Sequence, residues 1–198
     1  MANKKRGFGN PRLQKQLIAV VFVAILILQS FVPWLGYIPF GPLGNVTIIH
    51  ITVIIAGVLL GPLYGSIIGG VWGILSIVVT VTQPNLLTPV FINPMVSLFP
   101  RILVGLFSAL IFNGLRNRIN LNWSLIVTAI AGTLTNTGFV LLSILLFASN
   151  AFANALGISE SAVAVTFIAS LGLNFVFEII VAVIIIPIVS RALLRYKQ

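Results

Sequence analysis

Long apolar runs dominate this chain, and short polar or glycine- and proline-rich breaks divide them into six segments. The segments cover residues 16–35, 47–60, 63–81, 94–113, 123–148 and 165–191. Since a helix needs about 17–25 residues to cross a bilayer, the pattern predicts an all-α integral membrane protein. We expect a bundle of six transmembrane helices that forms a single domain over residues 1–198. The second segment is short, so it is expected to tilt or to begin at the membrane interface.

The composition supports a membrane protein and excludes several other classes. Hydrophobic residues make up 59% of the chain and charged residues only 7%, whereas a soluble domain carries about a quarter charged residues. The net charge of +9 could suit nucleic acid, but the soluble fold that such binding needs is absent. The chain contains no cysteine, which excludes disulfides, thiolate metal sites and cysteine nucleophiles.

Positive charge is distributed unevenly and predicts the orientation of the bundle. Ten of the eleven Lys and Arg residues lie near the two termini or in the break between the fourth and fifth segments. These ten are Lys4, Lys5, Arg6, Arg12, Lys15, Arg116, Arg118, Arg191, Arg195 and Lys197. Because cytoplasmic loops carry an excess of Lys and Arg, both termini are expected to be cytoplasmic, with the basic side chains near membrane lipid. Only Arg101 belongs to the outer half.

The connections on the predicted outer side are longer and richer in glycine, proline and aromatic residues. They cover residues 33–45, 82–93 and 149–161. Ordered loops above one end of a bundle often cap a ligand pocket, so we expect these loops to do so. Ordinary interfacial loops are the alternative.

The fourth segment places a basic residue at membrane depth. Asn93 and Pro94 have the residue types of a helix N-cap and first turn, so the helix is expected to start there. At 1.5 Å per residue, Arg101 then lies roughly 10 Å below that start. Ser97 and Gly105 share its helical face, so the arginine points along small residues rather than into lipid.

Two other segments place polar side chains at a similar depth, and two interpretations of the arginine follow. Thr133, Asn136 and Thr137 form one set, and Asn174 and Glu178 form another. In the first interpretation, the arginine forms a buried ion pair with Glu178. In the second, it binds an anionic ligand that the neighbouring amides and hydroxyls orient. The second is favoured because Glu178 lies several ångströms deeper.

His50 and Trp72 are further candidates for contact with a ligand. His50 cannot form a zinc site, because the chain has no second histidine and no cysteine, although it can hydrogen-bond a ligand. Trp72 lies one turn from Ser76, and the two could line a cavity. The chain lacks a GxxxxGK[ST] loop, paired carboxylates and any aspartate, so no enzyme activity, cofactor or metal is expected.

A ridge of small residues runs along the third segment. Gly65, Gly69 and Gly73 recur at four-residue spacing, which lets another helix approach closely. Packing within the bundle is the favoured interpretation, and an interface with a partner protein is the alternative.

Two stretches resemble a known family. "IPFGPLGNVTIIHITVIIAGVLLGPLYGSIIGGVWG" (residues 38–73) and "FINPMVSLFPRILVG" (residues 91–105) are similar to the substrate-binding S components of ECF-type vitamin transporters. The resemblance extends over nearly the whole chain. Within the family, "HITVIIAGVLLGP" and the "NP" and "PRILVG" of the second stretch look most like the pantothenate-specific members.

The resemblance implies a six-helix subunit of a bacterial cell membrane that captures a vitamin from outside with high affinity. It also implies three partner proteins, a membrane coupling subunit and two cytoplasmic ABC-type ATPases that power release. In many members, an Ala-x-x-x-Ala face of the first helix contacts the coupling subunit. Here Ala19 and Ala24 are five residues apart, and only Val20 and Ala24 have the four-residue spacing. The glycine ridge is a further candidate for this contact.

Pantothenate suits the polar set, since it carries one carboxylate, an amide and two hydroxyls. Arg101 is expected to bind the carboxylate, the asparagines the amide and hydroxyls, and Trp72 the dimethyl end. The candidate set is Arg101, Asn136, Asn174, Asn93, Trp72, Thr137, His50 and Glu178. Another vitamin such as riboflavin, or a membrane interaction subunit that binds no small molecule, remains the alternative.

Overall fold

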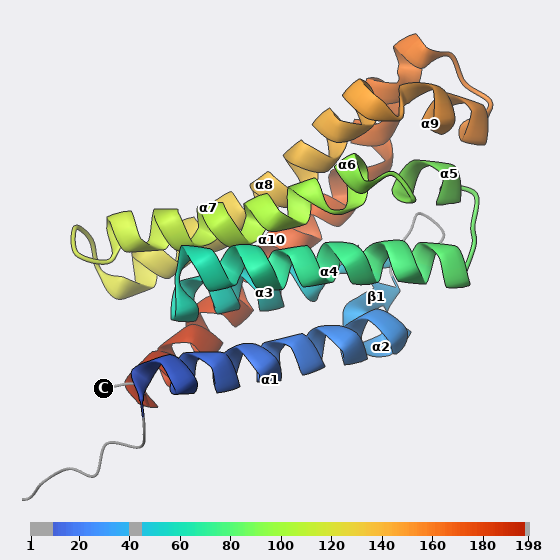
Figure 1. Cartoon of the computed structure of the whole chain (residues 1–198). Helices are drawn as coiled ribbons and strands as arrows, with labels where there is room; N and C mark the ends of the chain where they lie inside the picture. The colour runs from blue at the N-terminus through green and yellow to red at the C-terminus, as the bar shows by residue number, and fades with distance from the viewer. Residues whose placement is uncertain (1–9, 40–44, 197–198) are drawn as a thin grey trace, which may run out of the picture.

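The computed structural model describes residues 10–39 and 45–196, without the side chains of residues 11, 33, 37–39, 45–46, 170–174 and 196. Helices and two short strands follow one another along the chain (Figure 1). The elements are α1 (Pro11–Phe31), α2 (Pro33–Gly36), β1 (Tyr37–Pro39), β2 (Asn45–Thr47), α3 (Ile49–Leu60), α4 (Pro62–Thr82), α5 (Thr88–Phe91), α6 (Pro94–Ser97), α7 (Phe99–Leu115), α8 (Leu121–Phe147), α9 (Ser149–Leu156), the 3-10 helix η2 (Glu160–Ala162) and α10 (Val163–Tyr196).

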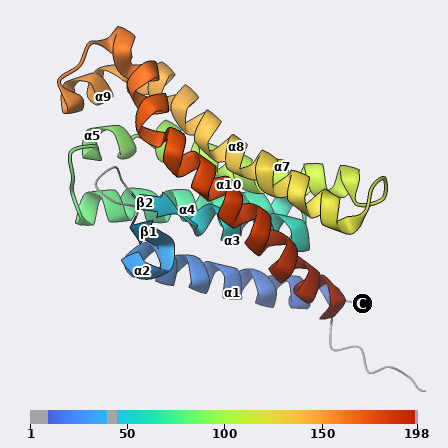
Figure 2. The same ribbon diagram turned by 180° about the vertical axis from the view of Figure 1, so that it is seen from behind.

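The long helices extend between two chemically different ends. One end, which we call the basic end, holds the start of α1, the end of α10, the α3–α4 turn and the α7–α8 loop (Figure 1). The opposite end, which we call the loop end, holds α2, the strands, α5 and α9, and α10 crosses the bundle between the two ends (Figure 2). The start of α1 and the end of α10 therefore lie on the same side of the bundle (Figure 1), as the distribution of Lys and Arg predicts.

The prediction of an α-helical membrane bundle is confirmed, apart from two three-residue strands. The second predicted span is the one that does not form a helix of membrane length. Five helical stretches are long and apolar enough to cross a bilayer, namely Arg12–Phe31, Pro62–Thr82, Pro94–Leu115, Leu121–Phe147 and Phe175–Arg195. Helix α3, in the second predicted span, has 12 residues. It is about 18 Å long, which is shorter than the ~30 Å hydrocarbon core.

The short α3 is explained by a hairpin that hydropathy does not reveal. The connection expected to be an outer loop contains α2 and two antiparallel strands, in which Tyr37 pairs with Thr47 and Pro39 pairs with Asn45. The chain therefore enters the bundle as a strand, and α3 begins only at Ile49. β-Branched residues such as Val46 and Thr47 favour both a strand and an apolar span, so the pattern alone does not separate the two.

Helix α3 forms the centre of the bundle. All twelve of its residues are buried, and it contacts α1, α4, α7, α8 and α10. The Oγ1 of Thr52 donates a 2.8 Å hydrogen bond to the Oε1 of Gln29, which joins α3 to α1. A second apolar cluster at the loop end includes Val96, Ile144 and Phe167 and packs α6, α8 and α10 together.

The glycine ridge packs inside the molecule, against α7. A Cβ atom on Gly65 would lie 2.5 Å from the carbonyl oxygen of Gly105, and one on Gly73 would lie 2.7 Å from the Cα of Leu98. A Cβ on Gly69 would overlap the carbonyl oxygen of Arg101. Since all three ridge glycines are buried here, the alternative assignment of the ridge to a partner interface is not supported by this packing.

The absence of cysteine allows a direct test of orientation. We expect Asn117→Cys, in the α7–α8 loop, to be protected from a membrane-impermeant maleimide in intact cells and to react after permeabilisation. Asn154→Cys, in α9, is expected to react from outside, because the excess of Lys and Arg predicts that the basic end is cytoplasmic. The reverse labelling pattern would contradict the predicted orientation.

Candidate functional site

A break between α6 and α7 places Arg101 in the first turn of α7. Asn93 caps α6, since its Oδ1 accepts a 2.9 Å hydrogen bond from the amide of Met95, as its residue type predicts. Its Nδ2 donates to the carbonyl of Phe147 at 3.2 Å and joins α6 to the end of α8. The described bonds of Asn93 are thus structural.

The guanidinium of Arg101 completes the backbone hydrogen bonding at this break. Pro100 has no N–H group, so it cannot donate to the carbonyl of Val96, four residues earlier. Instead, the Nη1 of Arg101 donates to that carbonyl. The side chain of Arg101 is only 8% exposed, so a positive charge lies in the interior of the bundle, where it is costly without compensation.

Trp72 contacts the same guanidinium from the neighbouring helix. The Cζ of Arg101 lies 5.2 Å from the centroid of the Trp72 ring, which is within the range of a cation–π interaction. Trp72 is 3% exposed and belongs to the main apolar core. We predicted a contact between Trp72 and the apolar part of a ligand, whereas the ring also supports the arginine.

His50 and Thr133 form a polar contact between α3 and α8. The Nε2 of His50 lies 3.2 Å from the Oγ1 of Thr133, and that hydroxyl donates to the carbonyl of Ala129 at 3.0 Å. Because the hydroxyl proton is engaged there, we assign the proton of the contact to Nε2 of His50. His50 is completely buried.

The polar set on α8 includes one amide whose hydrogen-bonding capacity is not used. Asn136 is partly buried, and its Oδ1 has no hydrogen-bond partner among the described residues. Thr137 follows it and is also partly buried. The side chain of Asn174, on α10, lies outside the described part of the structure. An unpaired buried acceptor of this kind suits a ligand N–H or O–H group.

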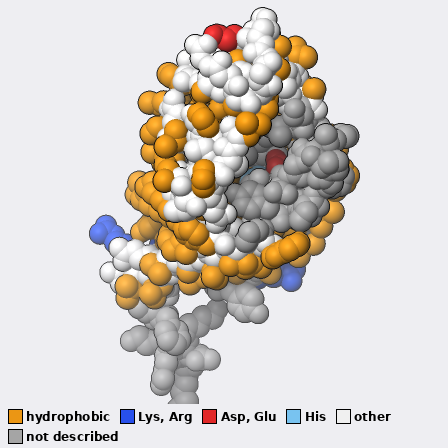
Figure 3. All heavy atoms as spheres, turned by 90° about the vertical axis from the view of Figure 1, so that its right-hand side faces the viewer, with side chains coloured by type: hydrophobic (Ala, Val, Ile, Leu, Met, Phe, Trp, Pro, Cys, Tyr) orange, Lys and Arg blue, Asp and Glu red, His pale blue; other side chains and the backbone are white. Residues whose placement is uncertain are grey.

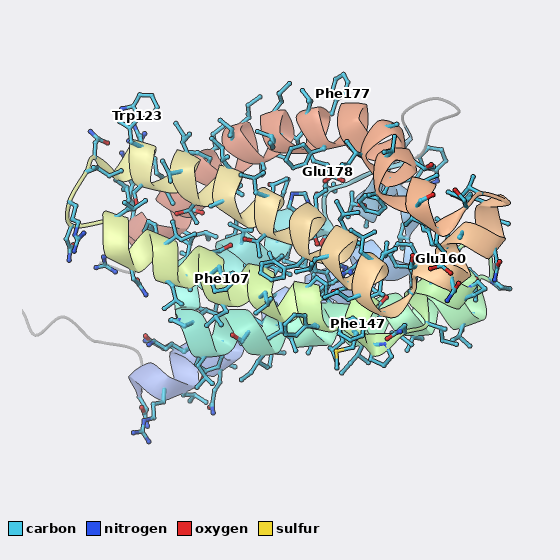
Figure 4. The ribbon with its side chains drawn as sticks, turned by 90° about the horizontal axis from the view of Figure 1, so that it is seen from above. Phe107, Trp123, Phe147, Glu160, Phe177 and Glu178 are labelled. Carbon is cyan, nitrogen blue, oxygen red and sulfur yellow. The ribbon has the colours of Figure 1, made fainter. Side chains whose placement is uncertain are left out.

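Glu178 points from α10 into the bundle, whereas the neighbouring Phe177 points away from it (Figure 4). Its Oε1 accepts a 3.0 Å hydrogen bond from the backbone amide of Thr47. Seen from the loop end, one of the two acidic side chains lies recessed within the molecule (Figure 3). Of the contacts described for Arg101 and Glu178, none joins the two side chains.

The described residues thus form a buried, mainly neutral polar region around one cation. Residue type and helical spacing identified the arginine, histidine and asparagines from the sequence. Two functional partners were missed, the carbonyl of Val96 and the amide of Thr47, because they are backbone groups. The Pro100–Arg101 pair was the available signal for the first of them. Within the described ranges, no three His, Asp or Glu side chains come together as a metal site would require.

The exposed apolar surface of α1 differs from the enclosed α3. Val20 is 65% exposed and Ala24 is also exposed, whereas Ala19 packs against the core. Two of the three residues predicted on the first helix therefore face outward, toward lipid or a partner.

Comparison with known proteins gives a consistent result. Residues 15–190 match the family described as "ECF transporter, substrate-specific component". The pantothenate transporter PanT of Leuconostoc mesenteroides is 34% identical over 199 aligned positions, covering 96% of this chain and 97% of the relative. The pantothenic acid transporter PanT of Lactococcus lactis is 30% identical over 200 positions, covering 91% and 94%. The solved structure of ThiT from Listeria monocytogenes has a TM-score of 0.61 at 19% identity, covering 92% of this chain and 96% of that chain, and supports the fold alone.

The close approach of α4 and α7 can be tested with two adjacent glycines. Gly69→Ala is expected to lower the free energy of unfolding by about 1–3 kcal/mol, because the new Cβ overlaps the backbone of Arg101. Gly70→Ala is the matched control, since its Cβ would meet only the side chain of Ile102, at 3.6 Å. Thermal unfolding in detergent measures both, and equal stability of the two variants would contradict this packing.

Proposed function

Because this chain belongs to the family of substrate-specific components of ECF transporters, we propose that it binds pantothenate for import across a bacterial cell membrane. Both curated relatives with nearly full-length similarity are named as transporters of pantothenate or pantothenic acid. Uptake would begin at the loop end, which the Lys and Arg distribution assigns to the outside.

The observation that carries the proposal is the buried Arg101. Its guanidinium lies against Trp72 and donates to the carbonyl of Val96, so two neutral groups fix its position. A carboxylate is the ligand group that pairs most strongly with a guanidinium, through charge-assisted and often bidentate hydrogen bonds. Pantothenate has one carboxylate, which we assign to Arg101.

The remaining polar groups suit the rest of the ligand. Asn136, whose buried Oδ1 has no hydrogen-bond partner among the described residues, would accept from the amide or a hydroxyl of pantothenate. Thr137 and Asn174 would supply further hydrogen bonds, and His50 would contact the ligand from α3. Trp72 would combine two tasks, support of the arginine and contact with the dimethyl end. Asn93 is assigned to the helix cap rather than to the ligand.

The proposed subunit does not itself hydrolyse ATP. A membrane coupling subunit and two cytoplasmic ATPases would supply the energy, and a substrate-specific component needs a surface for the coupling subunit. We assign that surface to the exposed face of α1 that includes Val20 and Ala24, because the glycine ridge is occupied by α7.

Binding can be measured without any ATPase. In calorimetry on the purified protein, we expect pantothenate to bind and riboflavin not to bind, because a buried cation favours an anionic ligand. Arg101→Ala is expected to weaken pantothenate binding by about 2–5 kcal/mol, or ~30-fold and more. Arg116→Ala, which removes the same charge from an exposed loop residue, is the control and should bind normally.

Two outcomes would count against the proposal. A wild-type protein that binds no pantothenate, and releases none on denaturation in mass spectrometry, would contradict the function. A folded Arg101→Ala variant with unchanged affinity would contradict the assignment of the carboxylate to this residue.

A further inference from the structure

The start of α3 is a helix terminus in the interior of the bundle. β2 ends at Thr47 and α3 begins at Ile49, and the N-cap residue Ile48 has no side-chain group that could accept a hydrogen bond from the first turn. The first amides of a helix lack partners within the helix and carry a partial positive charge. A buried terminus of this kind needs support from other elements, and the carbonyl of Gly36 provides part of it by accepting a 3.0 Å hydrogen bond from the N-cap amide of Ile48.

Glu178 of α10 holds Thr47, the residue that precedes the N-cap Ile48. Its Oε1 accepts from the amide of Thr47 at 3.0 Å, across 131 residues of chain. Glu178 is 9% exposed, so water competes little for the carboxylate. The contact attaches the junction between β2 and α3 to α10.

The first turn of α3 also carries His50, which provides a second attachment. His50 lies three residues after Thr47 and contacts Thr133 of α8 at 3.2 Å. Further along α8, one turn beyond Thr133, lies Asn136, with its unpaired acceptor. The start of α3 is therefore attached at two points, to α8 through His50 and to α10 through Thr47.

We propose that Glu178 is a positioning residue, which holds the first turn of α3 and His50 in the arrangement that the ligand meets, without contacting the ligand itself. This proposal rests on the proposed function of the site. It predicts that the hydrogen-bond acceptor at position 178 matters, whereas the negative charge does not. An ion pair with Arg101, or direct contact with the ligand, would make the charge decisive.

Two nearly isosteric substitutions separate acceptor from charge. Glu178→Gln keeps an oxygen that can accept from the amide of Thr47, and Glu178→Met fills a similar volume without one. In calorimetry with pantothenate, we expect Glu178→Gln to bind within about threefold of wild type. We expect Glu178→Met to bind about 10-fold more weakly or worse, as for loss of a hydrogen bond to a buried group.

The donor can be removed independently. Thr47→Pro lacks the N–H group and should weaken binding as Glu178→Met does, while Thr47→Ala keeps the amide and should bind normally. Combining Thr47→Pro with Glu178→Met should weaken binding little further, because both changes remove the same hydrogen bond.

Hydrogen exchange gives a readout that does not depend on the ligand. In the unliganded protein, peptides that cover residues 47–52 should exchange faster in Glu178→Met than in wild type, and at the wild-type rate in Glu178→Gln. Unchanged exchange in Glu178→Met would overturn the proposal, as would Glu178→Gln binding as weakly as Glu178→Met. If wild type binds no pantothenate, the proposed function fails, and the exchange measurement still decides the role of Glu178.

Discussion

Helix α3 has no side that faces the membrane, and its burial constrains the elements around it. Hydrocarbon offers no hydrogen-bonding groups, so the polar groups of a buried helix need partners inside the protein. Gln29 of α1 is bonded to Thr52, and Thr133 of α8 contacts His50. Just before the helix, Glu178 of α10 is bonded to the amide of Thr47. One short helix is thus joined by polar contacts to α1 and α8, and the residue before its N-cap is joined to α10.

The contact between α4 and α7 links helix packing to the candidate site. Because Gly69 has no side chain, the backbone of Arg101 can lie directly against α4, and the guanidinium then reaches the ring of Trp72, on the next turn. Pro100 leaves the carbonyl of Val96 for the same guanidinium to bond. Glycine, proline and tryptophan together determine where the buried Arg101 lies, so the site and the packing cannot vary independently.

The membrane-length helices differ in how far they are enclosed. In the most apolar 18-residue stretch, 17% of residues are buried in α1, 22% in α10, 28% in α4 and in α8, and 50% in the stretch formed by α6 and α7. Under the proposed function, ligand binding falls to the buried polar region, and contact with the coupling subunit falls to α1. Helix α3 lies between them, because it bonds α1 through Thr52 and carries His50 toward α8. Helix α3 therefore connects the region assigned to ligand binding with the helix assigned to the coupling subunit.

The sequence by itself determined the class of fold, because the lengths of apolar runs and the positions of Lys and Arg depend on the bilayer rather than on helix neighbours. It also identified the cap at Asn93 and the unusual Arg101, whose residue types have local meaning. Only the tertiary structure decided which residues pack against or hydrogen-bond one another. Hydropathy assigned Thr47 to the second span although it is the last residue of a strand, and helical spacing did not tell whether the glycines face α7 or another protein. The bond from Thr47 to Glu178 spans 131 residues, and a pairing of that kind depends on how the helices pack, which no local pattern records.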